Sequence, residues 1–230
     1  MRTVLGLALW CLALLMPAAA ADAPAQSVTG IPLDAPWKVT IYEFARTKFV
    51  HPAWGWQHSE RNYDIALELA RGDGLEVDRD VLFAAAFLHD MAAFVPCADA
   101  HMEHGDCAAQ ESGAVLRGAG FPMAKFPDVA AAERGHMYYR DPGAVPAAIV
   151  LHDADSLDFL GAVGAARMIA LTGEKAPSFA PAVKTLRSFV RDIPGRLITR
   201  TAKRMGRERA AQLQSFLDLL QAQTFDGKAM

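Results

Sequence analysis

A run of eight residues, 81–88, carries no polar side chain and ends directly at the pair His89-Asp90. Asp78 stands three residues before this run, where an aspartate can cap the first backbone N–H groups of a helix. A helix that is apolar on every side is normally buried, so this segment is predicted to be the central helix of the fold. A buried ionisable pair is costly unless it is satisfied, and metal coordination is the usual reason for one.

The rest of the chain also shows helical periodicity, and no segment alternates as a strand does. The breaker Gly72-Asp-Gly74 is expected to end the second helix. A loop that holds Cys97 and Cys107 is expected after His89-Asp90. Helices are predicted near residues 37–50, 57–71, 81–88, 107–118, 127–138, 144–172, 178–192 and 197–224. The fold class is therefore predicted to be all-α, a compact helical bundle.

The N-terminus has the pattern of a secretory signal peptide. Arg2 precedes an apolar run that ends at Met16, and Pro17 and four alanines follow. The run is shorter than the roughly 20 residues of a bilayer span, which disfavours the alternative of a retained membrane anchor. The mature protein is expected to be exported, periplasmic and free of the membrane. The predicted parts are a signal peptide (1–21), a flexible segment (22–35) and one domain (36–226).

Composition excludes one class of partner. The formal net charge is −3 and the isoelectric point is about 6.2. Binding of nucleic-acid polymers rests largely on neutralising phosphates with Lys and Arg, and this balance offers no basic footprint for it. A polynucleotide is therefore not expected as a partner.

The predicted export affects the expected oxidation state of the cysteines. Cys11 lies in the signal peptide, so the mature chain keeps Cys97 and Cys107. In an oxidising compartment such a pair is expected to form a disulfide. The spacing Cys97-x3-His101-x2-His104-x2-Cys107 also fits a small zinc site, and free thiols are the third alternative.

All seven histidines lie between residues 51 and 152, and several stand beside a carboxylate. Imidazole nitrogen and carboxylate oxygen together suit a divalent ion such as Mn²⁺, Fe²⁺, Co²⁺, Ni²⁺ or Zn²⁺. Adjacent residues do not share a helix face. His89 and Asp90 can therefore approach one ion only where their helix ends, with other helices supplying the remaining ligands.

Four segments occur in order between residues 45 and 224, and the first three of them hold candidate ligands. They are His58-Ser-Glu-Arg61, Ala85-Ala-Phe-Leu-His89-Asp90, Asp153-Ala-Asp155-Ser-Leu-Asp158-Phe-Leu-Gly161-Ala-Val-Gly164-Ala-Ala-Arg167 and Thr201-Ala-Lys-Arg-Met-Gly-Arg-Glu-Arg209. This order and spacing resembles the HD superfamily of metal-dependent phosphohydrolases, most closely its stand-alone bacterial members. A His-Asp dipeptide alone indicates nothing, whereas four motifs in order are specific.

The resemblance implies a metal ion held by His58, His89, Asp90 and Asp155. Within Asp-x-Asp it selects the second aspartate, hence Asp155 over Asp153. The ion is expected to be Mn, Fe, Co, Ni, Zn or Mg. The alternative for these four residues is a buried hydrogen-bonded network without a metal.

The resemblance also implies roles for His104 and His136, as second-metal ligands or as groups that contact the substrate phosphate. Asp90, His104 and His136 are the predicted catalytic residues. The segment from His104 resembles a His-Glu-x-x-Ser-Ala element of the family, but Gly105 and Ala108 replace the Glu and the Ser. Surface imidazoles are the alternative.

Five other residues have two interpretations each. Arg61 is expected either to hold a substrate phosphate or to form a structural ion pair, and Arg167 to pack or to pair between helices. Asp158 is a candidate for positioning a water or a ribose. Trp54 and Trp56 are expected either to stack on a base or to fill the core.

The predicted function is hydrolysis of a phosphoester or phosphoanhydride in a small phosphorylated substrate, such as a nucleotide. A divalent ion lowers the pKa of water and polarises the phosphoryl oxygen. The alternative is a di-iron HD-domain oxygenase, for which His58, His89, Asp90, His104, His136 and Asp155 would supply the ligands. A binding module that has lost catalysis is the third class, and the intact ligand set speaks against it.

Overall fold

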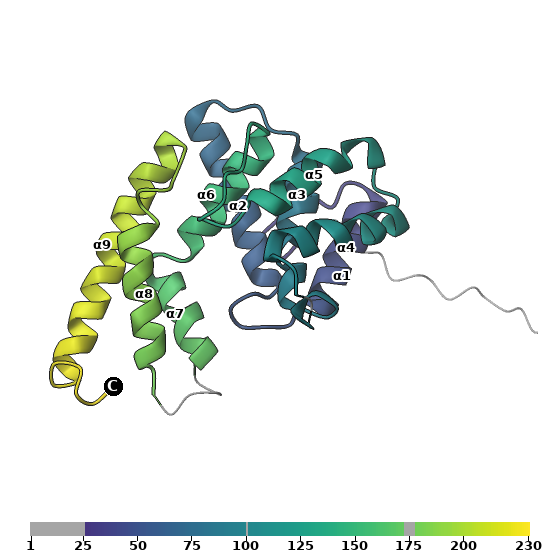
Figure 1. Ribbon diagram of the computed structural model, residues 1–230. Coiled ribbons are helices and arrows are strands. Elements are labelled where there is room, and N and C mark those ends of the chain that lie inside the picture. The colour runs from purple at the N-terminus through teal and green to yellow at the C-terminus, as the bar shows by residue number, and fades with distance from the viewer. Residues whose placement is uncertain (1–25, 100, 173–177) are drawn as a thin grey trace, which may run out of the picture.

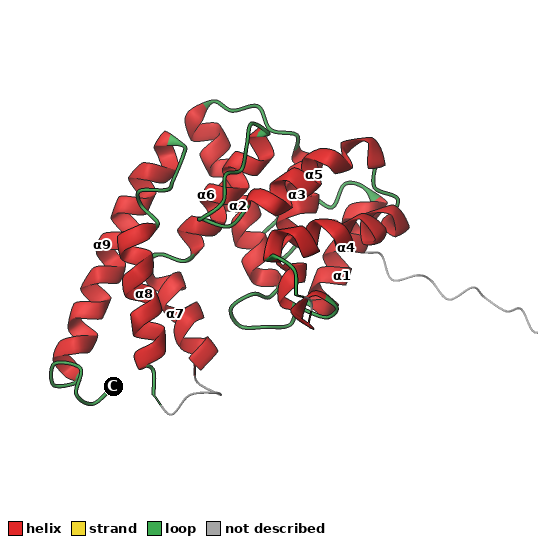
Figure 2. Cartoon of the chain, viewed as in Figure 1, coloured by secondary structure: helices red, strands yellow, loops and turns green. Residues whose placement is uncertain are grey.

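The computed structural model describes residues 26–99, 101–172 and 178–230. Within these ranges the chain forms nine α-helices, and a single isolated bridge from Gln26 to Pro32 is its only β-type pairing. Figure 2 shows helices joined by loops throughout. The prediction of an all-α bundle is therefore confirmed. The predicted signal peptide, 1–21, lies outside the described residues.

The helices follow the chain as labelled in Figure 1. They are α1 (Pro36–Lys48), α2 (Trp56–Asp73), α3 (Arg79–Leu88), α4 (His104–Ala119), α5 (Phe126–Gly135), α6 (Pro146–Asp158), α7 (Gly161–Thr172), α8 (Ala180–Asp192) and α9 (Arg200–Gln223). Three short 3₁₀ turns are η1 (His89–Ala93), η2 (Cys97–Asp99) and η3 (Met123–Lys125). None of the described helices has both the length and the apolar character that a bilayer crossing requires.

Helix α3 is the buried centre of the fold, as its sequence predicts. Every residue from Val81 to Leu88 is buried, with at most 1% of its surface exposed. The Asp78 carboxylate accepts the backbone N–H groups of Asp80 and Val81, which caps the helix. At Leu88 the α-helix gives way to the tighter turn η1, so the direction of the side chains changes there.

Helix α3 packs on α2, α5 and α6, and α2 and α5 both pack on α6. Each of these helices carries, within it or directly after its last residue, one or two polar residues of a common centre. Helix α1 lies against α3 and α4, while α7, α8 and α9 pack on one another at the other side of α6. In Figure 1 this second group forms the left part of the molecule, with α9 (yellow) at the edge, and α9 also packs on α2.

Three boundaries differ from the sequence prediction. The helix expected over 144–172 is two helices, because α6 ends at Asp158 and α7 begins at Gly161. Gly161 has φ of +68°, a conformation that favours glycine. Helix α5 ends at Gly135 rather than near residue 138. Helix α4 begins at His104, so Cys107 lies in its first turn and not in a loop.

Cys97 and Cys107 form a disulfide, with Cα atoms 5.8 Å apart. The predicted pairing is confirmed, and the alternatives of a zinc site or free thiols are wrong. The bridge ties η2 to the first turn of α4 and so fixes the segment that leads to His104.

The segment 22–35 was expected to be flexible, and residues 26–35 of it fall within the described part. Ile31 and Leu33 are buried against the core, with 2% and 6% of their surfaces exposed. The Ser27 side chain accepts the backbone N–H of Ile31. This end of the segment therefore packs as part of the domain.

Candidate metal centre

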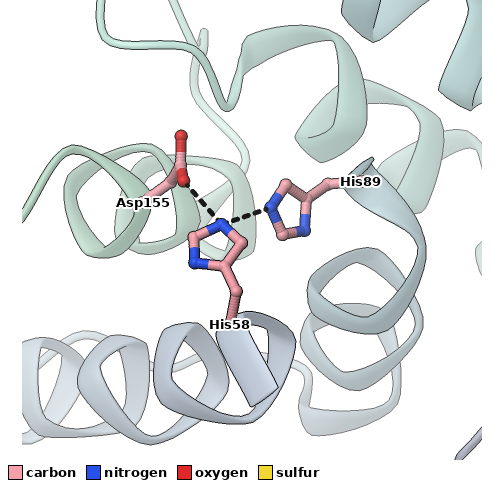
Figure 3. Close-up of side chains that lie close together, drawn as sticks. All are labelled: His58, His89 and Asp155. Atoms are coloured by element: carbon pink, nitrogen blue, oxygen red, sulfur yellow. Dashed lines mark hydrogen bonds and ion pairs between the residues drawn. The ribbon is translucent and has the colours of Figure 1, made fainter. Parts of the chain in front are cut away.

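Three side chains from three helices meet at one point (Figure 3). His58 comes from the first turn of α2, His89 from the first position after α3, and Asp155 from α6. His58 Nε2 lies 3.0 Å from Asp155 Oδ1 and 3.3 Å from His89 Nε2. All three side chains are at least 98% buried. The donor atoms lie within 4.8 Å of one another, as a shared metal ion requires.

Asp90 completes this group from the turn η1. Its Oδ2 lies 3.3 Å from His58 Nε2 and 3.6 Å from His89 Nε2, and it accepts no hydrogen bond. Burial alone raises the pKa of a carboxylate, but the imidazoles of His89 and His104 hold the pKa of Asp90 well below its usual value. The adjacent His89 and Asp90 reach one centre because α3 ends between Leu88 and this pair.

Three histidines are oriented by hydrogen bonds from their other ring nitrogen. The Nδ1 atoms of His58, His89 and His136 lie 2.7 Å from Asp158 Oδ2, 2.9 Å from the Ala86 carbonyl and 2.6 Å from the Glu133 carbonyl. Each Nδ1–H donates to its oxygen, which leaves the Nε2 lone pair directed toward the centre. At His58 that lone pair is also approached by Asn62 Nδ2 and Arg167 Nη2. A metal-binding histidine usually has such a partner.

Asp158 supports the site from behind. Its carboxylate accepts Arg61 Nε and Nη2, Arg167 Nη1 and His58 Nδ1. Although burial raises its pKa, these hydrogen bonds hold the pKa of Asp158 far below the usual range. Of the two interpretations of Arg61, the structure therefore supports the structural ion pair, which Arg61 forms with Asp158. Asp158 orients His58 rather than facing a substrate. Arg167 pairs and packs as predicted, and its Nη2 lies 3.2 Å from His58 Nε2.

The two aspartates of Asp-x-Asp point in different directions. Asp155 faces His58, whereas Asp153 accepts the backbone N–H groups of Ile198 and Thr199 at 2.9 and 2.7 Å, just before α9. Both side chains are buried. Asp153 therefore fixes the start of α9 and is not one of the converging donors.

A second group of possible ligands adjoins the first and comprises His89, Asp90 and His136. His136 is fully buried, and its Nε2 has no hydrogen-bond partner among the described residues. His104 Nε2 lies 3.2 Å from Asp90 Oδ1, and its ring centroid is 5.4 Å from that of His136. The side chains of His104 and His136 thus lie beside the first group, as the sequence pattern predicts.

Close packing explains why glycine stands at position 105, where the family element has Glu. A Cβ at this position would stand 2.6 Å from the Glu133 carbonyl oxygen. No larger side chain fits there without moving α5. Glycine therefore lets α4 approach the segment that carries His136.

A cavity of about 620 Å³ opens above the carboxylates of Asp90 and Asp155. Its walls carry apolar and aromatic groups as well as His104, and no lysine or arginine lines it among the described residues. The lining residues are His51, Trp54, Asp90, Ala92, Ala93, Ala98, His104, Met137, Asp155, Phe159 and Leu171. Trp54 therefore faces the cavity, whereas Trp56 packs edge-to-face on Tyr42 away from it.

Asn62 was not singled out from the sequence, yet it lies inside the group of donors. It follows His58 by one helical turn and is fully buried. Its Nδ2 lies 3.1 Å from His58 Nε2 and 3.4 Å from both His89 Nε2 and Asp155 Oδ1. Its spacing of four residues from a predicted ligand was the only indication in the sequence.

The family model of the HD domain matches residues 55–160. The chain contains an HD domain. The membership of the HD superfamily that the motifs predict is therefore confirmed. Among curated proteins, none matches this chain.

Several solved structures are similar to this one over most of their length. A Lactobacillus plantarum protein is 22% identical, with a TM-score of 0.64, and 81% of this chain and 96% of that chain are covered. YpgQ of Bacillus subtilis, solved in complex with ADP, is 21% identical, with a TM-score of 0.62 and coverages of 81% and 97%. A predicted HD superfamily hydrolase from an uncultured Thermotogales bacterium is 24% identical, with a TM-score of 0.54 and coverages of 81% and 90%.

The matched HD domain ends two residues beyond Asp158 and contains each of the converging donors. HD domains bind divalent metal ions, and the His and Asp groups of this site fit one. The matched domain therefore contains a candidate site for a divalent ion.

Proposed function

We propose that this HD-domain hydrolase cleaves a phosphoester or phosphoanhydride bond of a small phosphorylated molecule, such as a nucleotide. The observation that carries the proposal is the group of His58, His89, Asp90 and Asp155, buried at the floor of a cavity about 620 Å³ in volume. The similarity to YpgQ, which was solved with ADP, supports a nucleotide or a related phosphate.

Polar atoms of the site that lack hydrogen-bond partners fit a divalent ion. Asp90 Oδ2 and His136 Nε2 are buried and lack hydrogen-bond partners, and buried polar atoms of this kind require an explanation. A divalent ion, when bound, would polarise the phosphoryl oxygen and make water a better nucleophile near neutral pH. His58, His89, Asp90 and Asp155 are the residues that would hold it.

The protein's own groups would then act on the substrate. His104 borders the cavity and contacts Asp90, so its N–H groups can stabilise negative charge that develops on the phosphoryl oxygens. His136 lies behind it and can do the same or hold a second ion. The apolar walls shield the reacting group from bulk water and leave room for the organic part of the substrate.

Phosphate release tests this proposal. The metal-free protein is loaded in turn with Mn²⁺, Mg²⁺, Co²⁺, Ni²⁺ and Zn²⁺ and assayed on nucleotides and sugar phosphates. We expect turnover with at least one ion and its loss in Asp90→Ala, together with the bound metal. Equal activity of the Asp90→Ala protein would refute the assignment of the centre. No release from any phosphate, by a protein that binds metal, would refute the phosphohydrolase.

A di-iron oxygenase is the second candidate, and one observation favours it. The adjoining group of His89, Asp90 and His136, with His104 beside it, offers ligands for a second ion. Metal analysis separates the two functions. Two irons per chain, with oxygen consumption and no phosphate release, would establish the oxygenase. A His136→Ala protein that loses one of two ions would show a two-metal site.

We also propose that the protein is exported and acts in the periplasm, free of the membrane. The disulfide between Cys97 and Cys107 supports this, because disulfides persist mainly in oxidising compartments. N-terminal sequencing of the protein from a periplasmic fraction should find a start near Ala21 or Asp22. A membrane-bound protein that retains Met1 would contradict it.

A further inference from the structure

Asn62 occupies a position among the metal-ligating atoms that none of the HD motifs explains. Its side chain is fully buried on α2, one turn after His58. The amide nitrogen lies 3.1 Å from His58 Nε2, and 3.4 Å from both His89 Nε2 and Asp155 Oδ1. The amide group is therefore as close to these three donors as the donors are to one another.

These separations are those between ligands of one ion. Bonds of about 2.0–2.2 Å place two ligands roughly 3.0 Å apart at a right angle and roughly 3.4 Å apart at a tetrahedral angle. The His58 Nε2 distances to Asp155 Oδ1 and His89 Nε2, 3.0 and 3.3 Å, fall within this range. The Asn62 amide matches it at all three contacts. It lies where a further ligand of the same ion belongs.

The chemistry of the amide points the same way. Asn62 Oδ1 is buried and accepts no hydrogen bond. A half-turn of the amide exchanges its oxygen and nitrogen, and amide oxygens are ordinary ligands of divalent ions. A metal ion on His58 and His89 takes the lone pairs that the Asn62 N–H group contacts. Little therefore opposes the half-turn once an ion is bound.

We infer that Asn62 is an additional ligand of the metal ion, through its amide oxygen. With His58, His89, Asp90 and Asp155 it makes a set of two nitrogens and three oxygens. Such a set favours ions that accept five or six mixed ligands, Mn²⁺ and Fe²⁺, over tetrahedral Zn²⁺. The inference concerns the metal centre alone and holds whichever substrate the enzyme cleaves.

Mn²⁺ binding to the purified metal-free protein tests it without any substrate. Asn62→Val keeps the approximate size of the side chain and removes the oxygen. We expect the Mn²⁺ dissociation constant to rise by roughly tenfold to a hundredfold, the range found when residues that support a metal site are removed. Ser156→Ala is the matched control, because it removes an equally buried polar group beside Asp155 whose one hydrogen bond among the described residues is to the His152 carbonyl. Its affinity should not change.

A second readout separates a ligand from a hydrogen-bond donor. The relaxation of water protons counts the water molecules on bound Mn²⁺, and in Asn62→Val one water should replace the lost oxygen. Asn62→Asp, which keeps an oxygen at this place, should bind Mn²⁺ with the original water count. An Asn62→Val protein with unchanged affinity would overturn the inference, as would weaker binding with an unchanged water count. If Asn62→Val does not fold, Asn62→Asp decides: one water fewer on its Mn²⁺ refutes ligation, because the new carboxylate has then displaced a water that the Asn62 amide had left in place.

Discussion

The opposite orientations of Asp153 and Asp155 predict that two neighbouring carboxylates can be separated by experiment. Asp153 is fully buried and accepts the backbone N–H groups of Ile198 and Thr199. In Asp153→Ala both N–H groups lose their acceptor. The Thr199 N–H is buried, whereas the Ile198 N–H is part-buried. A buried donor left unsatisfied costs about 1–3 kcal/mol, so we expect the loss of the Thr199 contact to lower the free energy of unfolding by about 1–3 kcal/mol, with a smaller addition from Ile198.

Thermal unfolding of the metal-free proteins measures this loss. For a chain of this size each kcal/mol corresponds to roughly 2–4 °C in Tm, so even a loss of about 1 kcal/mol lowers Tm by about 2–4 °C. The Asp153→Ala protein should still bind Mn²⁺ with the original stoichiometry. Asp153→Asn is the matched control, because it keeps one acceptor oxygen and should lose less stability.

Asp155→Ala should behave in the opposite way. Asp155 Oδ1 lies 3.0 Å from His58 Nε2. Its contacts among the described residues are with the metal-site side chains and not with the start of α9. Its removal should abolish high-affinity Mn²⁺ binding. The reasoning fails if Asp153→Ala loses the metal while its Tm is unchanged, or if Asp155→Ala retains a full equivalent of Mn²⁺.

Two further predictions concern the edge of the cavity. Replacing both Cys97 and Cys107 by serine opens a loop with a sequence separation of 10. The loop-entropy model predicts that this reduces the free energy of unfolding by about 2.7 kcal/mol. Denaturant unfolding that shows no such loss would contradict this prediction. Trp54→Ala should raise KM for a phosphate ester that carries an aromatic group by roughly 5- to 100-fold, the value of one stacking contact. The KM for ethyl phosphate should not change in Trp54→Ala. Trp54→Phe keeps an aromatic ring and should keep most of the affinity for the aromatic ester. An equal rise in KM for both esters would show that Trp54 only supports the fold.

The elements of the fold that rest on local chemistry were predictable. The run 81–88 is apolar on all sides and is buried, and Asp78 caps it as the sequence indicates. The break between α6 and α7 was missed, because Phe159 and Leu160 continue the apolar pattern of a helix. Only the positive φ of Gly161 marks the boundary, and a glycine inside an apolar run does not reveal its conformation.

The site was predictable where a motif fixed it. The order of His58, His89-Asp90 and Asp155 follows the HD pattern, and the structure brings these side chains together. The role of Asp158 was not predictable. It depends on contacts with Arg61 and His58 across 97 and 100 residues of sequence, and a sequence shows no such pairing. Asn62 was missed because a polar residue one turn after a ligand is also common on a solvated helix face.

The charges around the centre favour a bound divalent ion. Arg61 and Arg167, the two guanidinium groups nearby, both donate to Asp158, so that carboxylate is neutralised within the protein. Asp90 and Asp155 are buried as well, yet among the described residues their charged or polar contacts are imidazoles and the Asn62 amide. Two buried carboxylates without a permanent cation are costly. A divalent ion would supply positive charge beside both carboxylates and would accept the Nε2 lone pairs of the imidazoles.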